Sequence, residues 1–196
     1  DRVMAGCGPL HGLIYSGIDP RRAEYFVDYE TYAGAAGAFA DLDGKDAVRV
    51  HVSGAANLPV ESVEQEFALT VGRYELITDS GGPGRFRGGL STRRDVTIWA
   101  EEARLAGRGL RQTRGAPGLF GGGVGKTGRF VLHADSDEER RLPGAFSELA
   151  IDPGTTVRVE TPSGAGYGSP LERDPALVLA DVISGKVSAE AASPDY

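Results

Sequence analysis

The stretch TVGRYELITDSGGPGRFRGGLSTRRDVTIWA, residues 70–100, shows how this chain is built. Residues 70–80 have the β-branched and aromatic content of a strand. Five glycines between residues 81 and 89 then indicate a backbone that bends where side chains do not fit. Strand-like composition returns around residues 96–100. A strand, a glycine-rich loop and a second strand predict antiparallel β-structure.

Strand and glycine-rich loop alternate along most of the remaining sequence. Further strands are predicted at residues 23–32, 47–54 and 155–160, with a strand and an acidic hairpin loop within 128–142. Residues 58–69 predict one or two helical turns with Pro59 early in them, whereas residues 1–23 are expected to be irregular. We therefore predict a mainly β fold of the α+β class, made of twisted antiparallel sheets with glycine-rich loops.

The character of the sequence changes in DPALVLADVISGKVSAEAA, residues 174–192. Asp174 is a good N-cap with Pro175 behind it, and residues 176–183 have a helical apolar pattern. Ser188 is predicted to cap a second short helix. The predicted organisation is a mainly β body, residues 1–172, and a short helical tail of the same region, residues 173–196.

Composition excludes several kinds of partner. The 21 basic and 28 acidic residues give a formal charge of −7, which argues against nucleic acid and against an anionic membrane. No apolar run approaches the roughly 20 residues of a membrane span. Cys7 is the only cysteine, so no internal disulfide can form and nothing indicates secretion. We expect a cytoplasmic protein and, because the chain begins with Asp1, a processed chain or a piece of a longer one.

The segment GAPGLFGGGVGKTGRF, residues 115–130, contains GKT after a run of glycines, as ATP-binding phosphate loops do. Such a loop also needs glycine five residues before Gly125, where Phe120 stands. It needs a buried strand before it and a helix after it, but the preceding residues are polar and the following ones predict a strand. The segment therefore predicts a glycine-rich connection between strands.

The loop at 81–89 is a better candidate for a catalytic or binding site. Asp79 and Ser80 stand at its entry, and two arginines follow within it. Backbone N–H groups in such a loop, together with arginines, can hold a carboxylate or a developing oxyanion, while a carboxylate at its entry can act as a base. The alternative is a packing turn in which Asp79 holds the loop and the arginines are solvated. The predicted catalytic residue is Asp79, and the predicted substrate-binding residues are Ser80, Gly81, Gly82, Arg85 and Arg87.

Two further acidic residues, Glu61 and Glu64, lie three positions apart and would share one face of a helical turn. They are predicted to be catalytic, either by positioning a base or by binding the edge of a metal. Asn57 is predicted to bind substrate beside them. The alternatives are a local cap or ion pair for Glu61 and an Asx-turn for Asn57.

The histidines are His11, His51 and His133, and none has a partner at metal-ligand spacing. The acidic segment after His133 has arginine where a calcium loop needs glycine. We therefore expect no complete metal site in this chain.

Four motifs occur in order along nearly the whole chain: NLPVESVE (57–64), RYELITDSGGPGRFRGGL (73–90), GAPGLFGGG (115–123) and GYGSPLERDPALVLADVISGKVSAEAA (166–192). With these motifs the sequence resembles the C-terminal part of the hydantoinase B/5-oxoprolinase family. It departs from the family's late glycine run at Ser163, Ala165 and Ser169. The longer N-terminal portion, which carries His/Asp metal ligands in the family, is absent.

The resemblance implies an enzyme that works with a hydantoinase A-type partner carrying ATP and magnesium. In such complexes ATP activates an amide or carbonyl oxygen, and the B half supports attack on the activated carbon. Water attacks in cyclic-amide hydrolases, and a carbon nucleophile meets activated bicarbonate in ketone carboxylases. The glycine connection at 115–130 agrees with an ATP site in the partner.

From the resemblance we expect part of the B-type subunit of an ATP-dependent cyclic-amide hydrolase, inactive on its own. A ketone carboxylase subunit and a non-catalytic structural piece are the alternatives. The expected partners are the A-type subunit, the remaining part of the B-type subunit and a small cyclic amide or ketone. A divalent metal is expected in the missing N-terminal portion, and no cofactor in this chain alone.

Overall fold

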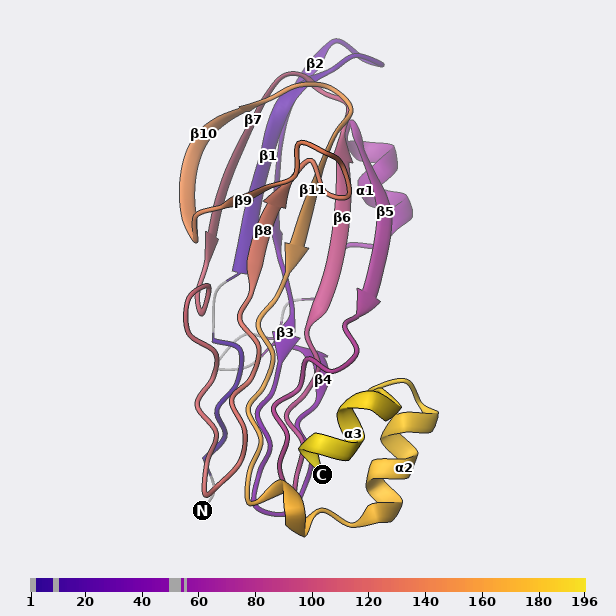
Figure 1. Cartoon of the computed structure of the whole chain (residues 1–196). Helices are drawn as coiled ribbons and strands as arrows, with labels where there is room; N and C mark the ends of the chain where they lie inside the picture. Colours follow the sequence, from indigo (N-terminus) through magenta and orange to yellow (C-terminus); the bar gives the residue numbers. More distant parts are fainter. Residues whose placement is uncertain (1–2, 9–10, 50–53, 55) are drawn as a thin grey trace.

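Two antiparallel sheets lie face to face in the computed structural model, which describes residues 3–8, 11–49, 54 and 56–196 (Figure 1). The four-stranded sheet has the order β10-β7-β1-β2, and the five-stranded sheet has the order β5-β6-β11-β8-β9. The first is made of β1 (His11–Asp19), β2 (Glu24–Thr31), β7 (Glu101–Gly109) and β10 (Ala145–Ile151). The second is made of β5 (Leu69–Leu76), β6 (Thr92–Ile98), β8 (Arg129–Leu132), β9 (Arg140–Leu142) and β11 (Thr155–Glu160). A short pair, β3 (Gly34–Ala35) and β4 (Asp46–Val48), lies below them.

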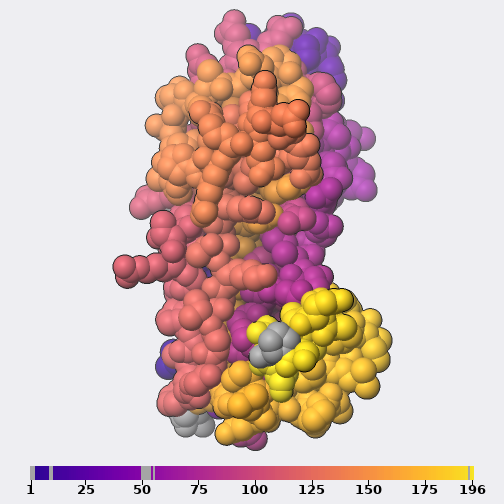
Figure 2. Space-filling model, viewed as in Figure 1, coloured from indigo at the N-terminus to yellow at the C-terminus, as the bar shows by residue number. Residues whose placement is uncertain are grey.

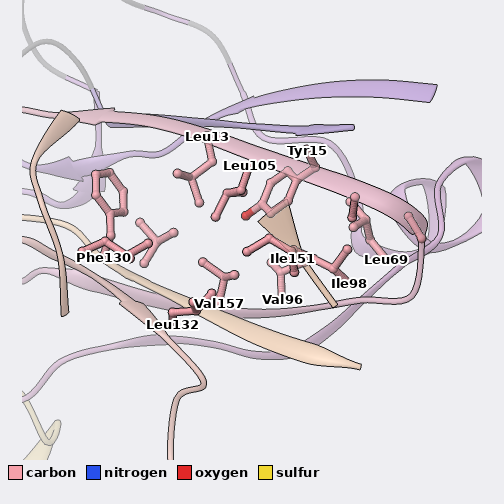
Figure 3. Close-up of a cluster of buried hydrophobic side chains, with 14 of the residues drawn as sticks. Leu13, Tyr15, Leu69, Val96, Ile98, Leu105, Phe130, Leu132, Ile151 and Val157 are labelled. Carbon is pink, nitrogen blue, oxygen red and sulfur yellow. The ribbon is translucent and has the colours of Figure 1, made fainter. Parts of the chain in front are cut away.

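The core fills the space between the two sheets. Leu13 and Leu105 come from the four-stranded sheet, and Val96, Phe130 and Val157 from the five-stranded one; all are at most 1% exposed (Figure 3). Alternate residues of each strand point inward because successive side chains of a strand point to opposite faces. Burial of each such side chain contributes about 1.5–3 kcal/mol. This apolar core holds the two sheets at a fixed spacing.

The structure confirms the predicted fold class and most of the predicted elements. Strands occur within 23–32, 70–80, 128–142 and at 155–160, and α1 (Val60–Glu66) is the helical turn predicted within 58–69. β8 begins at Arg129, which confirms a strand after the GKT segment. The predicted strand at 47–54 is described only to Val48 in β4, and residues 50–53 lie outside the described residues.

The prediction that residues 1–23 are irregular is wrong, because they contain β1, a central strand of the four-stranded sheet. Gly12 and Gly17 obscure its alternation in the sequence. At Gly17 an added Cβ would stand 2.8 Å from the Cβ of Ala100. This glycine is required by close packing within the fold and does not mark a turn.

Below the sheets, glycine-rich segments run side by side in extended form (Figure 1). We call residues 34–38, 81–89, 115–125 and 163–168 the glycine layer. Backbone hydrogen bonds join its segments: Gly82 N–H donates to Gly164 O at 2.9 Å, Gly164 N–H to Gly89 O at 3.0 Å and Gly89 N–H to Ala36 O at 2.9 Å. At Gly164 an added Cβ would lie 1.9 Å from the carbonyl oxygen of Ala36. Only glycine allows backbones to pack this closely.

The C-terminal tail packs beside the glycine layer (Figure 2). It follows the short 3-10 turn η1 (Pro170–Glu172) and contains α2 (Pro175–Ile183) and α3 (Ala189–Asp195). Both predicted caps are confirmed, because Asp174 accepts the N–H of Ala176 at 2.9 Å and Ser188 accepts that of Ala191 at 3.1 Å. The boundary between body and tail at 172/173 stays a prediction.

Candidate functional site

The residues that the sequence singled out fall into three separate places: the entry of the glycine layer, helix α1, and the side of the sandwich where β2 and β5 are the edge strands. Asp79 lies at the first of these. Its Oδ1 accepts the N–H of Ser188 at 2.7 Å, and its own N–H donates to Lys186 O at 3.1 Å. Asp79 has a φ of 60°, a left-handed conformation uncommon outside glycine. It therefore joins the end of β5 to the tail, and its catalytic role stays a prediction.

Ser80, Gly81 and Gly82 have structural partners within the protein. The hydroxyl of Ser80 donates to Ile77 O at 2.6 Å and accepts the N–H of Ser91 at 2.8 Å. The N–H of Gly82 is used by the glycine layer. At Gly81 an added Cβ would lie 2.2 Å from a backbone oxygen. Their predicted role in substrate binding stays a prediction, and in this conformation the N–H of Gly82 is already bonded.

The two loop arginines differ sharply. Arg85 is exposed, whereas Arg87 is 2% exposed and does not project from the loop. The Nε of Arg87 donates to Asp181 Oδ2 at 3.1 Å, and its Nη1 donates to Gly88 O at 2.6 Å. The carboxylate that the sequence led us to expect on Arg87 is thus supplied by the tail helix α2.

Arg87 belongs to a charge network that we call the tail network, made of Asp43, Asp46, Arg87, Arg173 and Asp181, of which the last three are buried. Arg173 donates to both oxygens of Asp43, at 2.7 and 2.8 Å, and to Asp181 Oδ2 at 2.7 Å. Burial acts to raise the pKa of Asp43, but Arg173 and Arg87 outweigh it and hold this pKa below its usual value. The network connects β-body and tail, and only Asp43 in it is appreciably exposed.

Glu61 and Glu64 lie on α1 as predicted and line the same surface hollow, of about 560 Å³, together with Arg21 and Arg22. One carboxylate oxygen of Glu64 is used in a hydrogen bond within the fold, because its Oε1 accepts the N–H of Val71 at 2.9 Å. Glu61 is exposed. Of the two predicted catalytic carboxylates, Glu61 is the one that faces solvent.

Asn57 lies beside a small cavity of about 60 Å³, lined also by Glu30 and Arg49. Its Nδ2 donates to the hydroxyl of Tyr74 at 2.5 Å, and its Oδ1 accepts from Arg49 Nη2 at 3.4 Å. The cavity is large enough for only a few water-sized groups. Asn57 is the predicted residue that the structure brings next to a polar interior.

That interior is an acid–tyrosine–arginine cluster made of Tyr15, Asp28, Glu30, Tyr32 and Arg94, each at most 6% exposed. The hydroxyls of Tyr15 and Tyr32 lie 2.7 Å apart, and Tyr32 donates to Glu30 Oε2 at 2.8 Å. Arg94 Nη2 lies 2.8 Å from Glu30 Oε1. Glu30, which lines the cavity at Asn57, is therefore the point where this cluster meets the surface.

The guanidinium of Arg94 lies between two aromatic rings. It is 5.9 Å from the ring centroid of Tyr32 and 5.3 Å from that of Tyr74. Such cation–π contacts are favourable, especially where water is excluded. Since Tyr74 is also the partner of Asn57, the cluster and the cavity form one continuous polar site.

Burial, followed by the charge of Glu30, raises the pKa of Asp28 to about 6, against the lowering effect of Arg94. Burial likewise raises the pKa of the Tyr15 and Tyr32 hydroxyls, so both stay protonated. A carboxyl with a raised pKa, on the residue that pairs with Tyr15 in the strand register, is a candidate proton donor or acceptor. We take this cluster, with Asn57 and its cavity, as the candidate functional site.

Asp28, Glu30, Tyr32 and Arg94 were missed in the sequence. A signal was available, because Asp28, Glu30 and Tyr32 alternate along a predicted strand and so share one face. Charged residues repeated on one face of a strand indicate either a solvated face or a buried polar site. The sequence does not say which, and only the packing of Arg94 against them decides it.

No group of three or more His, Cys, Asp or Glu side chains is placed to hold a metal ion among the described residues. The Nε2 of His11 lies 2.9 Å from the carbonyl oxygen of Leu110, and burial lowers the pKa of this histidine. His133 begins the turn after β8, and His51 lies outside the described residues. In the part of the chain that the structure describes, no helix is long and apolar enough to cross a membrane.

Comparison with known proteins gives a consistent result. The family model described as Hydantoinase B/oxoprolinase matches residues 1–170. Caprolactamase subunit beta of Pseudomonas jessenii is 33% identical over 206 residues, covering all of this chain and 35% of that protein. The crystal structure of the ATP-dependent caprolactamase from the same organism superposes with a TM-score of 0.76 and 28% identity, covering 100% of this chain and 35% of that one.

A nucleotide-free acetone carboxylase structure superposes with a TM-score of 0.79 at 20% identity, covering 97% of this chain and 30% of that chain. At this identity the likeness speaks for the fold alone. The chain spans about a third of the length of the caprolactamase subunit and of the two solved structures.

Proposed function

Because this chain belongs to the hydantoinase B/oxoprolinase family, we propose that it forms the C-terminal third of the B-type subunit of an ATP-dependent cyclic-amide hydrolase. The similarity to caprolactamase subunit beta over the whole chain carries this proposal, since a lactam is a cyclic amide. The likeness to acetone carboxylase supports the shared fold and does not by itself favour ketone carboxylation.

The proposed partners follow from the family. An A-type subunit binds ATP with magnesium, and the remaining part of the B-type subunit holds a divalent metal. On this proposal the chain on its own is inactive, because the ATP site belongs to the A-type subunit and the metal site to the remaining part of the B-type subunit. The complex works in the cytoplasm on a small cyclic amide.

Within that complex, we assign different tasks to the residues singled out above. Glu61 and Arg85 are exposed and can reach substrate or a partner. Asn57 and Glu30 stand at the cavity of the acid–tyrosine–arginine cluster and can orient a small polar group. Asp79 and Arg87 act as positioning residues, because they bind the tail.

The test begins with the composition of the native assembly. Native mass spectrometry, followed by the denaturing mass of each chain, is expected to show this polypeptide with an ATP-binding chain and a metal-bearing portion. Release of ADP is then measured with hydantoin, 5-oxoproline or caprolactam. We expect ADP release that depends on one of these cyclic amides.

Two results would contradict the proposal. ATP turnover that requires a ketone and bicarbonate would make the complex a carboxylase. A chain that purifies alone, with no ATP-binding partner, would leave only a structural role for it.

A further inference from the structure

The outer faces of the two sheets are built differently. On the five-stranded sheet, ion pairs cover the outer face: Arg158 bonds to Asp95 at 2.8 Å, and Arg93 bonds to Glu75 at 3.1 Å. A hydroxyl pair, Thr97 and Thr156, continues this pattern. The charged and hydroxyl groups of this face are bonded to one another, and the face can lie against water. This is expected where an antiparallel sheet has one face in the core and one in solvent.

The outer face of the four-stranded sheet has a different, apolar character along β1 and β2. Tyr25, Val27 and Tyr29 are 69%, 55% and 58% exposed, and Ile14 is 39% exposed. In the strand register Tyr29 pairs with Ile14, Val27 with Ser16 and Tyr25 with Ile18, so the apolar side chains form a strip that Ser16 interrupts on β1. We call Ile14, Ile18, Tyr25, Val27 and Tyr29 the apolar strip.

A surface hollow of about 640 Å³ continues the strip toward β10, lined by Tyr29, Ile14, Ala106 and Phe146 among others. Small residues shape it: the ring of Tyr29 lies against Gly12, where an added Cβ would be 3.0 Å from a ring carbon. Apolar residues line most of it, with Arg108 at its edge. Aromatic side chains beside a shallow apolar hollow are typical of a surface that another protein layer covers.

We infer that a third layer packs on the apolar strip and its hollow, and that this layer is formed by the remaining, N-terminal portion of the B-type polypeptide. This inference rests on the proposed function. On the outer face of this sheet the apolar side chains are gathered along β1 and β2, whereas β7 carries the exposed Arg104 and Arg108. Domains bury such apolar strips against further elements. The occupant follows from length, because this chain makes up only about a third of its relatives and two thirds of their polypeptide lie outside it.

The test uses the single cysteine of the chain. Cys7 is 2% exposed, so a thiol reagent has little native target. Val27→Cys places a thiol in the apolar strip, and Glu138→Cys, in the exposed acidic loop, is the matched control. Both variants are purified as the native assembly, and labelling rates are measured before and after unfolding in urea. Tyr25→Cys repeats the test at a second position of the strip.

In an assembly that contains the longer portion, the thiols introduced by Val27→Cys and Tyr25→Cys are expected to be labelled at least about tenfold more slowly than the thiol of the Glu138→Cys control, because labelling then requires local opening of the interface. Equal rates at the three positions in such an assembly would overturn this inference and leave the proposed function intact. Protection that appears only with self-association of this chain would also overturn it, since a second copy would then be the occupant. Absence of any longer partner chain would contradict the proposed function itself.

Discussion

The tail network allows a quantitative prediction. The substitution Asp181→Asn removes a negative charge that binds the guanidinium groups of both Arg87 and Arg173. Asp181 is also the one fully buried residue of α2, a helix whose Leu179 and Ile183 are exposed. Helix α2 is therefore held to the body through a charged contact, with little apolar burial along the helix, while Asp79 binds the residues that follow it.

The magnitude follows from what each arginine retains. Removing one partner of a buried ion pair costs about 3–5 kcal/mol. Arg173 keeps both oxygens of Asp43, whereas Arg87 keeps only Gly88 O and the more distant Asp46, 3.6 Å from its Nη1. We therefore expect a loss at the lower end, about 3 kcal/mol, in the free energy of tail opening.

Hydrogen exchange followed by mass spectrometry measures this directly in the native assembly. Exchange of the amides in residues 174–188 is expected to become about 100-fold faster, because a factor of ten corresponds to roughly 1.4 kcal/mol. Asp137→Asn, in the exposed acidic loop, is the control and should leave exchange in the tail unchanged.

A change of less than about threefold in the tail of Asp181→Asn would refute this reasoning. It would mean that the apolar contacts of the tail, and not the buried charges, hold it to the glycine layer. Equal acceleration throughout the β-sheets would refute the local character of the effect.

Three further predictions concern the sheet cluster, the glycine layer and α1. Since burial and Glu30 raise the pKa of Asp28 to about 6, from about 3.9 when unfolded, the folded state binds the proton more tightly, and stability is lost as the pH rises from about 4 through 6. In urea unfolding, Asp28→Asn should abolish this loss and be about 3 kcal/mol more stable than wild type at pH 8, because one pKa unit corresponds to about 1.4 kcal/mol; an unchanged pH profile would contradict it. Gly88→Ala should lower the free energy of unfolding by about 3 kcal/mol, because the added Cβ would lie 2.1 Å from Gly164 O. Gly72→Ala, whose Cβ would have nothing within 4 Å, is the control and should leave the free energy of unfolding nearly unchanged. Similar losses for both variants would be inconsistent with the close backbone packing. Glu64→Ala removes the bond to Val71 and should lower the free energy of unfolding by about 1 kcal/mol. Glu61→Ala should leave stability unchanged and lower the cyclic-amide turnover of the assembly. Unchanged turnover would remove Glu61 as a catalytic residue.

Much of the fold was predictable because its signals are local. Strand composition at 155–160 and the caps Asp174 and Ser188 depend on residues near in sequence, and the structure confirms them. β1 was missed because Gly12 and Gly17 hide a central strand whose partners, β2 and β7, complete it. A glycine marks a turn in one context and a close approach in another, and the sequence does not distinguish them.

The candidate site was less predictable, because it depends on which segments meet. Asn57 was predicted to bind substrate beside Glu61 and Glu64, and this role stays a prediction; its partners in the structure, Tyr74 and Arg49, come from other elements. The glycine loop was expected to offer Arg87 to a ligand carboxylate. The tail supplies that carboxylate as Asp181, from 94 residues further along the chain.

The sequence by itself determined that the chain is mainly β, that glycine-rich loops separate its strands, that two capped helices end it, and that it resembles one enzyme family. These properties follow from residue type and spacing. Only the tertiary structure decided that the glycines form a backbone-packed layer, that Arg87 and Arg94 are buried, and that burial raises the pKa of Asp28. The reason is physical: burial, close approach and the pKa of a carboxyl depend on the atoms that surround a residue, and those atoms come from distant parts of the chain.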